Sequence, residues 1–66
     1  MKNRIKVYRA MRNMTQEELA DQLRVTRRTI NSIEGDKYNP SIEVAFRMAK
    51  LFGVPVEELF SLDEDE

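Results

Sequence analysis

Apolar residues recur at helical spacing in two short neighbouring segments, Gln16–Leu23 and Arg27–Glu34. Each segment places its apolar side chains on one face, at Leu19, Ala20, Leu23, Ile30 and Ile33. Each also follows a threonine, Thr15 or Thr26, whose hydroxyl can cap a helix. Glu18, three residues after Thr15, completes a capping box. The pattern therefore predicts two helices separated by a three-residue turn.

This spacing is typical of a helix-turn-helix, in which the second helix presents its N-terminal side chains to the major groove of DNA. The predicted turn is Arg24-Val25-Thr26. Arg24 stands where many such turns have glycine, because the backbone there can need a positive φ. Val25 is expected to be buried beneath the turn.

The remaining pattern predicts three more helices, over residues 3–13, 42–52 and 56–60. Gly35 and Gly53 are suited to end helices, and Ser41 is suited to begin one. The expected core stripe of the fourth helix is Ile42, Ala45, Met48, Ala49 and Phe52. We therefore predict an all-α fold of five helices in one domain, residues 1–62, with a disordered acidic tail at 63–66.

Charge is divided unevenly along the 66 residues, although the net charge is only −1. Residues 1–50 carry all eleven Lys and Arg against six acidic residues, which leaves +5, whereas residues 51–66 carry six acids and no base. A polyanion responds to the local field rather than to the net charge of the chain. The first fifty residues can therefore approach nucleic acid. The alternative is ordinary surface charge with an acidic tail.

The residue types present argue against an enzyme. The chain has no cysteine and no histidine, so disulfides, thiolate metal sites and the commonest general base are excluded. It has no glycine-rich phosphate loop, and its carboxylates are scattered. We expect no cofactor, no metal and no catalytic residue. No apolar run is long enough to span a membrane and no signal peptide is visible, so a cytoplasmic protein is expected.

Five segments in register resemble the phage repressor and Cro-type (XRE-like) helix-turn-helix family. They are Arg9, TQEELA at 15–20, VTRRTINSIE at 25–34, YNPS at 38–41 and LFGVPVEELF at 51–60. The match covers about residues 4 to 60, and short stand-alone dimeric members are the most similar. Any one segment would be a weak signal, whereas five in one small domain are specific.

The resemblance implies roles for individual residues. Gln16 matches a glutamine that bonds a backbone phosphate and braces the recognition helix, and Arg9 and Glu34 match an ion pair that ties two helices together. The full set of residues implied to contact DNA is Gln16, Thr26, Arg27, Arg28, Asn31, Ser32, Lys37, Tyr38 and Asn39. Alternatives remain for Gln16 as a polar first-turn residue, for Tyr38 packed on its loop, and for Asn39 as a turn residue before Pro40.

Arg27 and Arg28 carry the sharpest functional signal. Adjacent like charges at the positively polarised start of a helix are unfavourable without an anion. Arginine also matches the O6 and N7 acceptors of guanine. We expect at least one of the two to read a base and the other to contact a base or a phosphate. The alternative is a solvated surface pair.

Apolar residues in excess near the C-terminus suggest a homodimer. The candidate interface is Val44, Leu51, Val56, Phe60 and Leu62, and Leu59 is expected to belong to the core instead. The alternative is that all of these residues complete a small core. The two termini are also candidates for a short β-ribbon.

The predicted function is that of a transcriptional regulator, acting as a repressor that binds operator DNA as a homodimer without a small-molecule effector. Two alternatives use the same fold: an antitoxin that also binds a toxin, and a protein-binding adaptor that has lost DNA contact. Gln16, Arg27 and Arg28 argue against the adaptor, which would not need hydrogen-bond donors at those positions.

Overall fold

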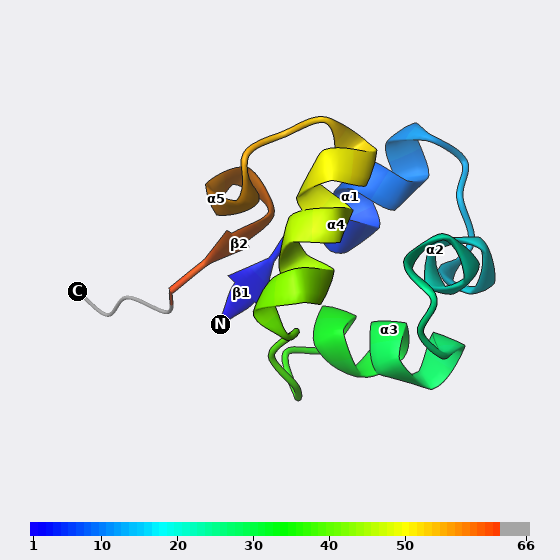
Figure 1. Cartoon of the computed structure of the whole chain (residues 1–66), viewed down its shortest axis with the longest axis horizontal. Helices are drawn as coiled ribbons and strands as arrows, with labels where there is room; N and C mark the ends of the chain where they lie inside the picture. Colours follow the sequence, from blue (N-terminus) through cyan, green and yellow to red (C-terminus); the bar gives the residue numbers. More distant parts are fainter. Residues whose placement is uncertain (63–66) are drawn as a thin grey trace.

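Five helices and one two-stranded ribbon make up the computed structural model, which describes residues 1–62 (Figure 1). In chain order they are β1 (Lys2–Asn3), α1 (Ile5–Met11), α2 (Gln16–Leu23), α3 (Arg27–Glu34), α4 (Ile42–Phe52), α5 (Val56–Leu59) and β2 (Phe60–Ser61). α4 runs through the middle, with α2 and α3 to one side and α5 and the ribbon to the other (Figure 1). The predicted acidic tail at 63–66 lies outside the described residues.

α2 and α3 have the bounds expected from the sequence, because the residues that cap each helix lie close to one another in the chain. The Thr15 hydroxyl accepts a hydrogen bond from the Glu18 N–H at 3.0 Å, and the Glu18 carboxylate accepts one from the Thr15 N–H at 2.9 Å. The Thr26 hydroxyl caps α3 by accepting from the Thr29 N–H, and the Ser41 hydroxyl caps α4. The predicted capping box is confirmed.

The first and last helices are shorter than predicted. Lys2 pairs with Ser61 and Asn3 with Phe60 in an antiparallel register, so these residues are extended rather than helical. The Arg4 N–H donates to the Leu59 carbonyl oxygen at 2.9 Å, which continues the attachment between the two ends. The expected β-ribbon of the termini is thus present within a single chain.

Positive φ angles occur where the helices end. Asn13, Arg24 and Asp36 have φ of 52°, 62° and 61°, and Gly53 has φ of 72°. Arg24 therefore adopts the left-handed conformation expected in the turn between α2 and α3, at a cost that glycine would avoid. Gly35 follows α3, as predicted, but its φ is −84°. Asp36, the next residue, adopts the left-handed conformation instead.

The core lies between α4 and the other helices. Its buried residues are Ile5, Leu19, Ala20, Leu23, Ile30, Ile33, Met48, Ala49, Phe52 and Leu59. The prediction for Ile42 was wrong: it is 74% exposed, because it lies in the first turn of α4, at the edge of the stripe that the other helices cover. Phe46, which shares that side of α4, is 58% exposed.

Asn3 fastens the ribbon to the end of α3. Its side-chain nitrogen donates to the Ile33 carbonyl oxygen and to the Asp36 carboxylate, each at 2.9 Å. Its side-chain oxygen accepts from the Ile5 N–H at 3.1 Å, which helps to begin α1. The ribbon and the last turn of α3 are therefore held together by side-chain bonds.

Replacing Gly53 with alanine is expected to lower the free energy of unfolding by about 1 kcal/mol, because φ is positive there while a Cβ would meet no atom within 4 Å. The control is Gly35→Ala, where φ is negative and the new Cβ would lie 3.4 Å from the Asn31 carbonyl oxygen. We expect that variant to change stability by less than about 0.5 kcal/mol. Urea unfolding measures both, and equal losses would contradict the assignment of strain to Gly53.

Candidate nucleic-acid interface

α2 and α3 pack through small and branched apolar residues at their crossing. Ala20 and Leu23 from α2 and Ile30 from α3 are at most 1% exposed. The turn between the helices is tight, since the Val25 N–H donates to the Ala20 carbonyl oxygen at 3.0 Å. Val25 itself is half-buried against the core, in keeping with its expected place beneath the turn. These contacts hold α3 at a fixed angle to α2.

The outer face of α3 carries polar side chains that remain available. Arg27, Arg28 and Asn31 are exposed, and Ser32 is half-buried. Among residues 1–62, neither arginine forms an ion pair or a side-chain hydrogen bond. Both stand in the first turn of α3, where the helix dipole favours an anion.

Residues from both helices meet in an open hollow. Gln16 from α2 and Arg27, Arg28 and Asn31 from α3 line about 300 Å³ of space at the protein surface. Four of the residues predicted to contact DNA are therefore brought together. Thr26, at the start of α3, lies next to this group, but its hydroxyl is already occupied as the helix cap.

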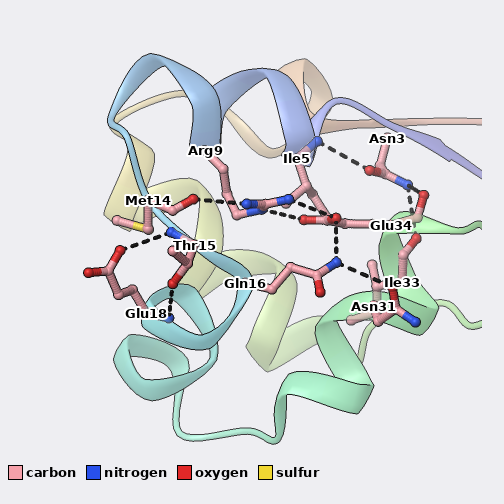
Figure 2. A network of polar contacts seen from close by, with 10 residues as sticks. All are labelled: Asn3, Ile5, Arg9, Met14, Thr15, Gln16, Glu18, Asn31, Ile33 and Glu34. Atoms are coloured by element: carbon pink, nitrogen blue, oxygen red, sulfur yellow. Dashed lines mark hydrogen bonds and ion pairs between the residues drawn. The ribbon is translucent and has the colours of Figure 1, made fainter.

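A buried ion pair lies next to Gln16, one of the residues that line the hollow (Figure 2). Nε of Arg9 donates to Oε2 of Glu34 at 2.6 Å, and Nη2 of Arg9 to Oε1 at 3.1 Å. The Glu34 side chain is only 1% exposed and that of Arg9 17%. Nη1 of Arg9 donates to the Met14 carbonyl oxygen at 2.8 Å, so the same guanidinium also fixes the loop before α2. The structure contains the ion pair implied by the resemblance.

Gln16 is bonded directly to α3, in keeping with the bracing role that the resemblance implies. Its Nε2 donates to Oε1 of Glu34 at 2.9 Å and to Oδ1 of Asn31 at 3.3 Å. Both hydrogens of its amide therefore point into the protein network rather than toward an external phosphate (Figure 2). This arrangement links α2 to the middle and the end of α3.

The loop after α3 holds the other predicted contact residues. Lys37, Tyr38 and Asn39 are all exposed, with Tyr38 at 53%. The loop is anchored because the Lys37 N–H donates to the Ser32 carbonyl oxygen at 3.0 Å. These three residues do not line the hollow between α2 and α3.

The residues predicted for a dimer interface divide into two groups. Val44 and Leu51 are half-buried and pack against the core, as do Val56 and Phe60, whereas Leu62 is 73% exposed. Val56 and Phe60 also border an apolar hollow of about 350 Å³. Its complete lining is Met1, Pro40, Ile42, Ala45, Phe46, Val56 and Phe60. Leu59 is fully buried, as expected.

Asn3 is the residue with a positioning role that the sequence did not indicate. Its contacts with α3 span about thirty residues of chain. The only local signal was an asparagine two residues before the start of a helix, where its oxygen caps the Ile5 N–H.

Neither a membrane-spanning helix nor a cluster of metal ligands is present among residues 1–62. None of the helices there is long and apolar enough to cross a membrane. That range also contains no group of three or more His, Cys, Asp or Glu side chains that could hold a metal ion.

Replacing Glu34 with alanine leaves the Arg9 guanidinium mostly buried without its carboxylate. We expect the free energy of unfolding to fall by about 3–5 kcal/mol. The control is Glu43→Ala, which breaks the exposed pair with Arg47 (2.6 Å) and should cost less than about 0.5 kcal/mol. Thermal unfolding followed by circular dichroism compares the two, and similar losses would show that burial of the Arg9–Glu34 pair is unimportant.

Comparison with known proteins agrees with this geometry. A family model described as helix-turn-helix matches residues 5–59. An uncharacterised HTH-type transcriptional regulator of Methanocaldococcus jannaschii is 53% identical over 66 residues, the full length of both chains. The cryptic phage CTXphi transcriptional repressor RstR of Vibrio cholerae is 34% identical over 62 residues, which are 94% of this chain and 56% of RstR.

A solved structure shows the same fold. The hypothetical transcription factor NHTF from Neisseria superposes with a TM-score of 0.72 and 27% sequence identity. The match covers 79% of this chain and 58% of the Neisseria chain. With the family model spanning most of the chain and a full-length relative above half identity, the chain belongs to the helix-turn-helix family of DNA-binding transcriptional regulators, a class without enzymatic activity.

Proposed function

We propose that this protein represses transcription by binding a palindromic operator as a homodimer, with α3 of each subunit in the major groove. The observation that carries the proposal is that Arg27 and Arg28, both in the first turn of α3, form no ion pair with any other residue in the range 1–62. A helix start with two such cations needs an anionic partner, and double-stranded DNA supplies both phosphates and guanine acceptors. RstR, a relative with the name of a repressor, supports the direction of regulation.

Base reading falls to the polar side chains on the outer face of α3. Arg27 and Arg28 come first, and Asn31 and Ser32 follow one turn later on the helix. Side chains one turn apart on a helix that lies in the major groove reach neighbouring base pairs. A residue buried toward α2, such as Ile30, is excluded from this role.

Phosphate contacts are assigned to both flanks of α3. Thr26 stands at its start, and Lys37, Tyr38 and Asn39 are exposed in the loop beyond its end. Contacts to the backbone on two sides fix the register of the helix in the groove without reading sequence. We also assign Gln16 to the surface that contacts DNA, although both N–H groups of its side chain already donate to Glu34 and Asn31.

The proposed dimer interface centres on the apolar hollow between α4 and α5. Val56 and Phe60 border this hollow, and Leu62 borders a second hollow that shares both residues. Ile42 and Phe46 belong to the proposed interface because they line the first hollow and are largely exposed. Val44 and Leu51 support the interface from the core side. A dimer reads two half-sites about 34 Å apart, which gives the affinity that a single short helix lacks.

Replacing Arg28 with alanine is expected to weaken binding to the selected DNA site about 10- to 100-fold and to relax the preference at one base position. Lys37→Ala should weaken binding to all sequences equally and reduce the slope of log K against log salt by about 1. The control is Lys50→Ala, in the last turn of α4, which should change neither quantity. Selection from a random DNA library, followed by salt titration, measures these effects.

Two results would contradict this assignment. The first is an Arg28→Ala variant that selects the same motif with the same strength. The second is a rise in transcription when the protein is added to a promoter carrying the selected site, since repression requires a fall.

Replacing Ile42 with lysine is expected to convert the dimer to a monomer, because the charge would be buried in the proposed interface. Ile42 is 74% exposed in the single chain, so the fold should survive. The control is Met11→Lys on α1, where an apolar side chain is 70% exposed away from the hollow. Analytical ultracentrifugation at micromolar concentration distinguishes the outcomes, and a monomeric unmodified protein would argue against the interface.

A further inference from the structure

We propose that Arg24, in the turn between α2 and α3, makes a further contact with a DNA phosphate, and that this contact explains why the turn holds a strained arginine instead of glycine. Arg24 is not among the residues assigned to DNA above. The inference rests on the proposed function, since it concerns the surface that α2 and α3 present to DNA.

The backbone of Arg24 adopts a conformation that suits other residue types better. Its φ is 62° and its ψ is 41°, in the left-handed region. This region costs free energy for a residue with a Cβ, and short polar side chains such as those of Asn and Asp tolerate it best. Asn13 and Asp36, the other non-glycine residues of the range 1–62 with positive φ, are of that kind. At Arg24, glycine would be the less strained residue.

The turn does not need the arginine side chain to hold its shape. It is closed by main-chain bonds, from the Arg24 N–H to the Asp21 carbonyl oxygen at 3.3 Å and from the Val25 N–H to the Ala20 carbonyl oxygen at 3.0 Å. Glycine at position 24 would form the same bonds. The Arg24 side chain is exposed, and within residues 1–62 it takes part in no ion pair or hydrogen bond.

The C-terminal end of α2 already has another cation. Nη1 of Arg47, from α4, donates to the Leu23 carbonyl oxygen at 2.9 Å, next to Arg24 in the chain. Arg9 and Arg12 likewise donate to main-chain carbonyl oxygens, at 2.8 and 3.2 Å. Arg24 makes no such bond. A strained backbone whose side chain has no internal partner indicates a functional reason for the residue.

The position of Arg24 in the chain places it beside the proposed DNA surface. It precedes Thr26, assigned above to a phosphate, by two residues, which span at most about 7 Å. That distance is shorter than the Debye length of about 8 Å at physiological salt. Arg24, Arg27 and Arg28 are the charged residues of the stretch 22–33, which contains no acid. The turn therefore extends the positive charge of the α3 start beyond the helix itself (Figure 1).

A contact from the turn differs in kind from the contacts of α3. Arg27 and Arg28 belong to the helix proposed to enter the groove, whereas Arg24 stands before its cap. A guanidinium at that edge meets the phosphate backbone, which fixes the register of the protein on DNA and carries no sequence information. The expected signature is a loss of affinity for every sequence, with an unchanged motif.

The test is a salt titration of binding to the selected DNA site with the full chain and its Arg24 variants. Arg24→Gln keeps the Cβ and a polar side chain but removes the charge. We expect the slope of log K against log salt to decrease in magnitude by about 1, and binding at 0.1 M salt to weaken about 8-fold. Random-library selection should return the same motif.

Two other substitutions separate backbone strain from charge. Arg24→Gly should weaken binding as much as Arg24→Gln, while its melting temperature stays the same or rises by up to about 8 °C. Arg24→Lys keeps the charge and should keep the salt slope. The control for removal of a cation elsewhere is Lys50→Gln, in the last turn of α4, which should leave both slope and affinity unchanged.

Four outcomes would overturn the inference while the loss of base preference in Arg28→Ala still supports the proposed function. They are an unchanged salt slope with Arg24→Gln, equal losses with Arg24→Gln and Lys50→Gln, a changed motif with Arg24→Gln, and a lower melting temperature with Arg24→Gly. The last would show that the fold itself uses the arginine. If the unmodified protein binds no DNA, the proposed function fails and the inference fails with it.

Discussion

The buried ion pair between Arg9 and Glu34 is the interaction on which the rest of the structure depends. One guanidinium bonds the carboxylate at the end of α3 and the Met14 carbonyl oxygen before α2. α1, α2 and α3 are thereby fixed relative to one another by a single cluster of charge-assisted bonds. Such a pair contributes less to stability than to geometry, since burying two charges offsets most of their attraction. The geometry matters here because a regulator must present α3 rigidly.

Hydrogen bonds also attach α3 to two other parts of the fold, one at its middle and one at its end. Near the middle of α3, Asn31 is held by Gln16 from α2. At its end, the Ile33 carbonyl oxygen is held by Asn3 from the terminal ribbon. The partner of Asn3 in that ribbon is Phe60, which also borders the apolar hollow proposed for dimer formation. The surface proposed to read DNA and the surface proposed to pair two subunits are therefore joined through Asn3 and the ribbon.

Much of the site could be predicted because its signals are local. The caps at Thr15 and Thr26 follow from residues three positions away, and the outward placement of Arg27 and Arg28 follows from the helical spacing of Ile30 and Ile33. The Arg9–Glu34 pair was obtained only through family resemblance, since 25 residues separate the two. The resemblance implied that Gln16 braces α3, but its two partners, Glu34 and Asn31, were not predicted. No local pattern distinguishes a glutamine that faces solvent from one that faces a buried carboxylate.

The sequence by itself determined where α2, α3 and α4 begin, which of their faces are apolar, and where the backbone turns at Arg24 and Gly53. Each of these features depends on neighbouring residues within one or two helical turns along the chain. Only the tertiary structure decided that Ile42 stays exposed, that Asn3 is extended rather than helical, and that the Gln16 amide faces inward. Each of these depends on a partner distant in the chain. Whether a side chain is covered or an amide is paired is set by which helices pack beside it, and that arrangement is a property of the whole fold.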